Sequence, residues 1–272
     1  MRDVFARLVA LDIDGTLLDS ANPISDATTA SLRELRNRGL QIVFVSSRPI
    51  ASLVSLARRI GIDAHLIAYN GALVRNISGQ ELLAESFVID GRLIGILRRF
   101  CSSGGAVNVY VCGALHWLAF GQSTFVDIEE LATGLTADSR LPSDALPKMV
   151  GTSVLKVMCR GVELACKQLL VDMESYSNLD AVASGWDCCD IQAKGVGKGH
   201  AVKLLCRNLG IAPDDVVAFG DSDSDASMLR LAGYGVAVGA ATDRAKMAAR
   251  EHIDGPGSNA LADWLDRIAT AD

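Results

Sequence analysis

The sequence predicts an α/β protein whose core is a Rossmann-like, doubly wound parallel sheet. Short apolar runs recur near both ends of the chain, and each is followed by a segment with the periodicity of a helix. The runs are continuously apolar, as expected of strands that helices cover on both faces. They span residues 8–11, 42–45, 66–68, 216–219 and 236–238.

Residues that begin and end helices stand between these runs. Ser25 can cap the start of one helix, and Gly39 stands where that helix should end. Pro49 opens a second helix, which should stop at Gly61. A third segment with an apolar stripe covers 202–209. Strands therefore alternate with helices, which is the order that produces a parallel sheet.

The middle of the chain departs from this alternation. After a helical segment at 91–102, the runs AVNVYV and ALHWLAF flank Cys112-Gly113 and predict an antiparallel hairpin. Further elements complete a second α/β unit, namely a strand at 154–158, a helix at 162–174 and two short strands near 181–191.

The length of 272 residues fits one large domain or two unequal ones. The inserted elements add up to roughly a hundred residues, which is a common size for a domain. We therefore expect a core at 1–81 and 187–272, interrupted by an inserted α/β cap domain at 82–186.

Charge and cysteine content exclude several classes of protein. Asp and Glu (32) outnumber Lys and Arg (26), and no basic cluster is present, so a nucleic acid partner is not expected. Seven cysteines without a CxxC pair fit neither a disulfide framework nor a zinc site, which indicates reduced thiols. The sequence shows no signal peptide and no 18-residue apolar stretch, which favours a cytoplasmic protein with no membrane association.

Two aspartates, Asp12 and Asp14, follow the first apolar run in LVALDIDGTLLD. They therefore stand at the carboxyl end of a buried strand, where open α/β sheets keep their sites. On an extended backbone a spacing of two points both side chains the same way, and Gly15 permits a tight turn beyond them. Two acids in one site repel each other, so a cation is expected beside them.

A third carboxylate, Asp221, follows the run at 216–219 in FGDSDSD. Together with Asp12 and Asp14 it offers a set of oxygen ligands with no nearby His or Cys. Such a set suits Mg²⁺ and disfavours zinc.

Taken with FVSSRP and GVGKGH, these residues resemble the four sequence motifs of the haloacid dehalogenase-like superfamily, and in particular its Cof-type branch of sugar phosphatases with a class IIB cap. The resemblance spans almost the whole chain. Five segments carry it in the family's order: DIDGTLLD, the SSRP segment, YNGALV, GVGKG and GDSDSDASML.

The resemblance implies that Asp12 is the nucleophile, which attacks phosphorus to form an aspartyl phosphate. Asp14 would protonate the departing alkoxide and then take a proton from the water that hydrolyses the intermediate. Mg²⁺ would be held by Asp12, the main-chain carbonyl of Asp14 and Asp221. Asp225 would orient this set from behind.

The resemblance also implies a set of groups around the phosphoryl oxygens. Ser46 and the main-chain N–H groups of Ile13 and Ser47 would donate hydrogen bonds to them, and Lys198 would add positive charge. Ser46-Ser47 replaces the Thr-Gly that relatives usually show, and Ser46 keeps the hydroxyl group. Ser224 stands where relatives carry Asn, and its shorter side chain would contact phosphate only through water.

Three residues are candidates for contact with the substrate. Asn70 and Gly71 follow the run at 66–68, and they either contact the leaving group of the substrate or form a turn. Arg48 is the third candidate. The nearby sequence GVGKG fits neither a phosphate-binding P-loop nor a dinucleotide fingerprint.

Two further pairs favour packing over chemistry. Cys188 and Cys189 would point to opposite faces of a strand, so one redox site cannot use both. His116 and Trp117 could line a substrate pocket, but aromatic residues are common on sheet faces, and packing is the favoured interpretation.

We therefore expect a Mg²⁺-dependent hydrolase of a small phosphorylated metabolite, such as a sugar phosphate or a phosphorylated cofactor precursor, acting as a monomer or homodimer. The resemblance implies that the cap closes over the site and determines specificity. Two alternatives remain: a phosphomutase or phosphotransferase with the same Asp12 chemistry, and a phosphate-binding module without turnover. Asp14 argues against the binding module, which would have no use for that carboxylate.

Overall fold

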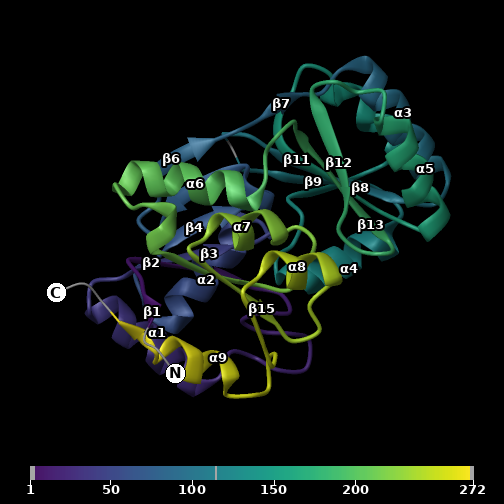
Figure 1. Cartoon of the computed structure of the whole chain (residues 1–272). Helices are drawn as coiled ribbons and strands as arrows, with labels where there is room; N and C mark the ends of the chain where they lie inside the picture. Colours follow the sequence, from purple (N-terminus) through teal and green to yellow (C-terminus); the bar gives the residue numbers. More distant parts are fainter. Residues whose placement is uncertain (1–3, 114, 270–272) are drawn as a thin grey trace. The chain divides into compact units, whose positions relative to one another are not determined.

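A computed structural model describes residues 4–113 and 115–269. The chain divides into two compact units (Figure 1). The first is built from Met1–Leu83 and Gly197–Asp272, and the second is Ala84–Val196. Each unit has its own sheet and its own hydrophobic core.

The sheet of the first unit has β2 near its centre, and the strands from β16 to β4 run parallel. The chain winds outward from β2 through β3 to β4, and later from β14 through β15 to β16. The carboxyl ends of β2 and β14 therefore meet where the winding changes direction. In spatial order the strands are β16 (Glu251–Ile253), β15 (Tyr234–Val238), β14 (Val216–Gly220), β2 (Leu8–Asp12), β3 (Gln41–Val45), β4 (His65–Ala68), β5 (Leu73–Asn76) and β6 (Glu81–Ala84).

Helices cover both faces of this sheet. On one face, Ala10 and Val43 of the strands pack in one cluster with Val202 and Leu205 of α6 and with side chains of α7. Figure 1 shows α1 and α9 on the other side of the strands. The doubly wound α/β core is thus confirmed. Its helices are α1 (Asp26–Asn37), α2 (Ile50–Ile60), α6 (Lys198–Leu209), α7 (Ala226–Leu231), α8 (Asp243–Ala248) and α9 (Ala260–Leu265), and the short strands β1 (Val4–Phe5) and β17 (Ile268–Ala269) pair separately.

The expected helix ends are also confirmed. The side chain of Ser25 accepts a hydrogen bond from the main-chain N–H of Thr28 and so caps α1. Pro49 immediately precedes α2, and Gly61 ends that helix in the left-handed conformation. These ends set where β3 and β4 begin, and therefore which residues reach the carboxyl edge of the sheet.

The second unit contains a mostly antiparallel sheet in the order β10-β9-β8-β11-β13-β12, with β7 also paired to β11. The predicted hairpin is confirmed as β8 and β9. Helices α3 and α5 cover one face, and α4 packs through Val126 on the other. The elements are β7 (Phe87–Val88), α3 (Gly91–Ser102), β8 (Ala106–Val111), β9 (Trp117–Gly121), α4 (Ser123–Thr133), β10 (Ser139–Leu141), β11 (Ser153–Arg160), α5 (Glu163–Met173), β12 (Leu179–Ala183) and β13 (Cys188–Ala193).

The second unit extends past the boundary that we expected at 186. Strand β13 pairs with both β11 and β12, so it belongs to the second sheet, and the first unit resumes only at Gly197. The segment CCDIQA mixes apolar residues with Asp190 and Gln192, and this composition does not indicate which of the two sheets it joins. Which sheet the segment joins depends on its pairing partners elsewhere in the chain, and the local sequence does not identify those partners.

Of the four residues for which packing was favoured, Cys188, Cys189 and Trp117 are buried, whereas the prediction for His116 is wrong. Cys189 lies in the apolar core of the second unit, and burial raises the pKa of Cys188 to about 12, which disfavours its reactive thiolate. All seven cysteines carry free thiols. The buried indole of Trp117 donates its N–H to Asn108 Oδ1 at 2.9 Å, whereas His116 is largely exposed beside Asp138.

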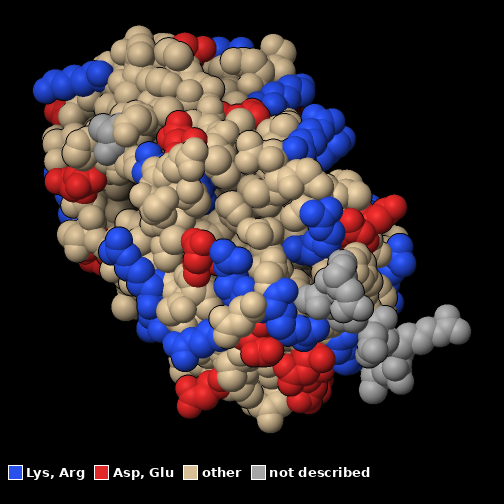
Figure 2. All heavy atoms as spheres, turned by 90° about the vertical axis from the view of Figure 1, so that its left-hand side faces the viewer, with Lys and Arg blue, Asp and Glu red and all other residues tan. Residues whose placement is uncertain are grey.

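The surface carries both signs of charge. On the face shown in Figure 2, basic and acidic side chains are interspersed over the described residues. Within residues 4–113 and 115–269, no helix is both long and apolar enough to cross a bilayer.

A buried ion pair in the second unit leads to a stability prediction. Lys156 Nζ lies 3.1 Å from Asp190 Oδ1, with both side chains almost completely buried. We expect Asp190→Ala to lower the free energy of unfolding by about 3 kcal/mol, because a buried ammonium loses its partner. Urea denaturation followed by tryptophan fluorescence measures this.

Asp172→Ala is the matched control, because it breaks the Arg99–Asp172 pair, in which Arg99 is largely exposed. It should cost less than about 1 kcal/mol. Equal losses in the two variants would contradict the importance of burial.

Candidate active site

Four charged side chains from separate elements meet at the carboxyl edge of the first sheet. Asp12 ends β2, Asp221 follows β14, Asp225 precedes α7, and Lys198 is the first residue of α6. Carboxylate oxygens of the three aspartates lie within 4.8 Å of one another. The structure therefore brings together Asp12 and Asp221, two of the three acids that we predicted from the ends of strands, and adds Asp225 to them.

Lys198 is the cation inside this acidic cluster. Its Nζ donates to Asp12 Oδ1 at 2.6 Å and to Asp225 Oδ1 at 2.7 Å. The side chain is only 4% exposed. Burial acts to lower the pKa of Lys198, but the charges of Asp12 and Asp225 outweigh burial and raise it. Lys198 is therefore held as an ammonium ion.

Three carboxylates and one ammonium leave two negative charges in this cluster. Burial, followed by the charge of Asp225, raises the pKa of Asp12 well above its ordinary value. The pKa of Asp221 is raised for the same two reasons. A divalent cation would balance the remaining charge, and the donors here are oxygen atoms, as Mg²⁺ prefers. The residues present therefore fit a magnesium ion.

Both carboxylate oxygens of Asp225 accept hydrogen bonds from protein groups. Its Oδ1 accepts from Lys198, while its Oδ2 accepts from the main-chain N–H of Ser222 at 2.9 Å and from the Ser222 hydroxyl at 2.6 Å. This arrangement suits a residue that orients its neighbours. Sequence reasoning missed Ser222, although it stands in the segment GDSDSD that we singled out.

Asp221 packs against the turn after β2. Its Oδ1 accepts from the buried hydroxyl of Thr16 at 3.2 Å. Gly15 has φ 86° and lies so close that a Cβ there would be 2.4 Å from Asp221 Oδ2. Gly15 and Thr16 of the DGT segment thus contact the Asp221 side chain and hold its position. We did not predict this role of Thr16 from the sequence.

Asp14 forms a separate pair with Arg48 at the end of β3. The guanidinium Nε donates to Asp14 Oδ2 at 2.8 Å and Nη2 donates to Oδ1 at 2.6 Å. Asp14 is 50% exposed, in contrast to Asp12. In this structure Arg48 therefore contacts the predicted acid and base.

The loop after β4 forms a turn that braces the site. Tyr69 and Asn70 have φ of 52° and 56°, and the main-chain N–H of Asn70 donates to the Ser46 carbonyl at 3.0 Å. Gly71 has φ 108°, and a Cβ there would lie 2.5 Å from the carbonyl oxygen of Gly197, directly before Lys198. The turn interpretation of Asn70-Gly71 is confirmed, and their contact with substrate stays a prediction.

The remaining predicted residues lie on the same edge of the sheet. Ile13 follows Asp12 and is fully buried. Ser46, also buried, and Ser47 follow β3, and Ser46 Oγ accepts from the main-chain N–H of Arg48 at 3.1 Å. Ser224 Oγ lies 2.8 Å from Ser222 Oγ and so adjoins the network around Asp225.

The sequence profile of the haloacid dehalogenase-like hydrolases matches residues 9–265. The chain belongs to this family. Among curated proteins, it is 29% identical to an HMP-PP phosphatase of Cronobacter sakazakii over 238 residues, which cover 86% of this chain and 84% of the relative. It is 28% identical to a phosphoglycolate phosphatase of Pyrobaculum neutrophilum over 265 residues, covering 96% and 95%.

The fold of this haloacid dehalogenase-like hydrolase also occurs in a solved sugar phosphatase of subclass IIB of the superfamily. The TM-score is 0.78 at 21% identity, and the match covers 96% of this chain and 98% of that one. The likeness confirms the architecture that the motifs predict for this hydrolase.

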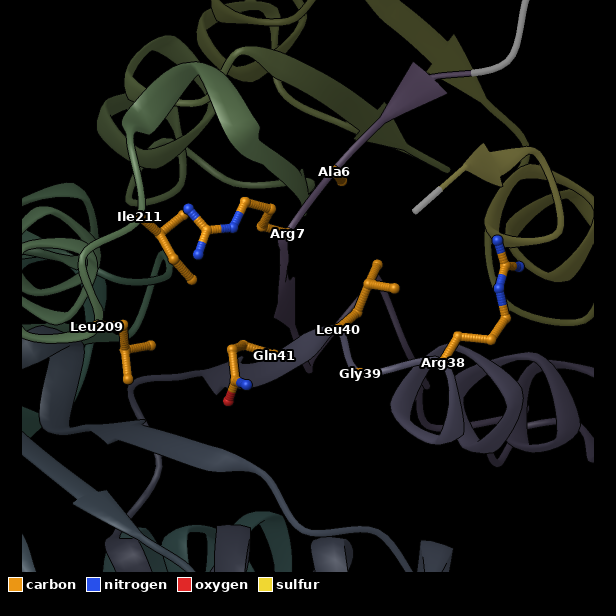
Figure 3. A pocket seen from close by; sticks show the side chains of 8 residues that line it. All are labelled: Ala6, Arg7, Arg38, Gly39, Leu40, Gln41, Leu209 and Ile211. Atoms are coloured by element: carbon orange, nitrogen blue, oxygen red, sulfur yellow. The ribbon is translucent and has the colours of Figure 1, made fainter. Parts of the chain in front are cut away.

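A cavity of about 210 Å³ lies elsewhere in this hydrolase (Figure 3). Arg7 and Gln41 line it at the amino ends of β2 and β3, opposite to the end that carries Asp12. Arg7 donates to the Gly210 carbonyl at 3.2 Å, and Arg38 donates to the Ile268 carbonyl at 3.0 Å. The cavity is thus separate from the acidic cluster.

The contact between Gly15 and Asp221 generates a prediction. Gly15→Ala should lower the free energy of unfolding by about 1–2 kcal/mol through its left-handed backbone. The clash with Asp221 should add roughly 1–3 kcal/mol. Urea denaturation of the purified variant measures the sum.

Gly39→Ala is the control, because Gly39 has φ 92° and a Cβ at this position would meet no atom within 4 Å. It should show only the backbone cost. If the two variants lose equal stability, the Asp221 side chain moves away from the new methyl group without cost, and the turn does not hold it in place.

Proposed function

We propose that this hydrolase cleaves phosphomonoesters by attack of Asp12 on phosphorus, with Mg²⁺ as cofactor. The observation that carries the proposal is the buried Asp12 carboxylate, 2.6 Å from the Lys198 ammonium and grouped with Asp221 and Asp225. A buried carboxylate in contact with an ammonium group is a suitable nucleophile toward a phosphoryl group.

In the first step an oxygen of Asp12 bonds to phosphorus as the bond from phosphorus to the leaving oxygen breaks. Lys198 offsets negative charge on Asp12 and on the incoming phosphoryl group, which would otherwise repel each other. The product is an aspartyl phosphate, and water then attacks it to release inorganic phosphate.

Asp14 transfers the protons in both steps. It donates a proton to the leaving alkoxide and later accepts one from the attacking water. Its carboxylate is half exposed, so a leaving group and water can both reach it. Asp12, buried at 3% exposure, is not available for this exchange with solvent.

Asp12, Asp221 and the main-chain carbonyl of Asp14 are the proposed ligands of Mg²⁺. When bound, the ion neutralises the negative charge that gathers on the phosphoryl oxygens. Asp225 holds Lys198 and the Ser222 backbone in place. The two uncompensated charges of the cluster support this assignment.

Ser46 and the N–H groups of Ile13 and Ser47 are proposed to bind the phosphoryl oxygens, with Ser224 acting through water. These residues stand at the ends of β2 and β3 and next to the Asp225 network. Donors fixed on strand ends need little rearrangement as charge develops on phosphorus.

The proposed substrate is a small phosphorylated metabolite. The two curated relatives are named for different compounds, HMP-PP and phosphoglycolate, so the shared feature is the phosphate group. We assign specificity to the second unit, which we propose to act as a cap. Seven free thiols support a reducing, cytoplasmic location, and the oligomeric state is proposed to be a monomer or homodimer.

Phosphate release tests the nucleophile. Wild type should release phosphate from p-nitrophenyl phosphate and from members of a panel of sugar and cofactor phosphates. Asp12→Ala should reduce the rate at least about 10³-fold, because the attacking atom is lost. Asp63→Ala, which removes an exposed carboxylate paired with Arg36, should retain wild-type rates.

No release from any compound by wild type would move the proposal to a phosphate-binding module. Products in which phosphate appears on an added sugar rather than in solution would identify a phosphotransferase.

Magnesium binding is tested without turnover. Mg²⁺ at about 100 times its Kd should raise the stability of wild type by about 2.7 kcal/mol, which thermal unfolding detects. EDTA should reverse the shift, Asp221→Ala should abolish it, and Asp63→Ala should keep it. An unchanged shift in Asp221→Ala would remove Asp221 from the metal site.

A further inference from the structure

Arg48 and Asp14 make the most complete ion pair at the edge of the first sheet. Two guanidinium nitrogens face the two carboxylate oxygens, at 2.8 Å and 2.6 Å. This fork fixes the plane of the carboxylate as well as its position. A single contact, such as a lysine makes, would leave the carboxylate free to rotate.

The guanidinium is anchored on its other side. Its Nη1 donates to the hydroxyl of Ser52 at 3.3 Å, and Ser52 is a buried residue of α2. The Arg48 backbone is held as well, because its N–H donates to Ser46 Oγ at 3.1 Å and its carbonyl accepts from the Tyr69 N–H at 3.2 Å. Through Arg48, the Asp14 carboxylate is therefore held in a fixed position relative to β3 and α2.

Asp14 needs such support more than the other acids of the site. Asp12 and Asp225 are buried and share Lys198, whereas Asp14 stands on a turn with its side chain half exposed. The hydrogen bond from the Gly15 N–H to the Leu18 carbonyl holds the turn's backbone but not the carboxylate. Proton transfer requires the donor oxygen within hydrogen-bond reach of the leaving oxygen.

We infer that Arg48 is a positioning residue, which holds the Asp14 carboxylate in place for proton transfer instead of contacting the substrate. The inference rests on the proposed function and deepens it. Arg48 acts through Asp14, so its loss should slow leaving-group release only where that release requires a proton. Water attack on the aspartyl phosphate also uses Asp14 and is common to all substrates, so the substrates are compared in the leaving-group step alone.

Leaving groups of different basicity separate this role from a structural one. p-Nitrophenolate departs without a proton, whereas the alkoxide of a sugar phosphate requires one. Arg48→Gln should lower the single-turnover rate of leaving-group release about 10- to 100-fold with a sugar phosphate and change that rate less than about threefold with p-nitrophenyl phosphate. Arg48→Lys should recover little, because the fork is lost.

The matched control is Arg36→Gln, which breaks the Arg36–Asp63 pair at 2.9 Å and should leave both substrates unaffected. A rise in KM for both substrates at unchanged kcat would show that Arg48 binds substrate. Equal losses of the single-turnover rate on both would show a structural role. Either result overturns the inference while the proposed phosphatase function stands.

A second measurement does not depend on turnover. The unfolding equilibrium constants of wild type, Arg48→Gln, Asp14→Asn and the double variant form a cycle. It should be non-additive by at least about threefold, because the two side chains contact each other directly. Additive effects would overturn the inference even in a protein that releases no phosphate.

Discussion

The ammonium group of Lys198 is the contact on which the rest of the site depends. It lies within 2.7 Å of carboxylate oxygens of Asp12 and Asp225, and the three side chains are buried. Burial acts to lower the pKa of Lys198 and to raise the pKa of Asp12. Their proximity keeps Lys198 charged, but one cation cannot compensate three carboxylates. The pKa of Asp12 therefore stays raised, and the cluster retains the charge that a divalent cation neutralises.

This contact depends on how the chain re-enters the first unit. Lys198 lies 186 residues after Asp12, and the second unit ends at Val196, two residues before it. The carbonyl of Gly197 packs against Gly71, in the turn whose Asn70 N–H bonds to Ser46. The turn after β4 thus fixes the start of α6 and the end of β3 together. A side chain at position 71 would disturb both.

The sequence predicted the parts of this site that follow from strand ends. Asp12 and Asp221 could be found because they stand one and two residues after a continuously apolar run, and parallel strands align their carboxyl ends. Thr16, Ser222 and Ser52 escaped notice because their roles depend on where a hydroxyl points, which residue type and spacing do not report. The end of the second unit was misplaced for a related reason, since β13 is assigned by long-range pairing and not by its own composition.

The two cations of the site differ in a way that matches the acids they hold. In the proposed mechanism Asp12 stays dry and ionised, and a lysine suits it because a compact ammonium can contact two buried carboxylates at once. The proposed role of Asp14 is to exchange protons with a leaving group and with water, which requires an exposed side chain. An exposed carboxylate gains order from a partner that fixes its plane, which is what the guanidinium of Arg48 does at 22% exposure. The choice of lysine in one place and arginine in the other therefore follows from the exposure that each proposed step requires.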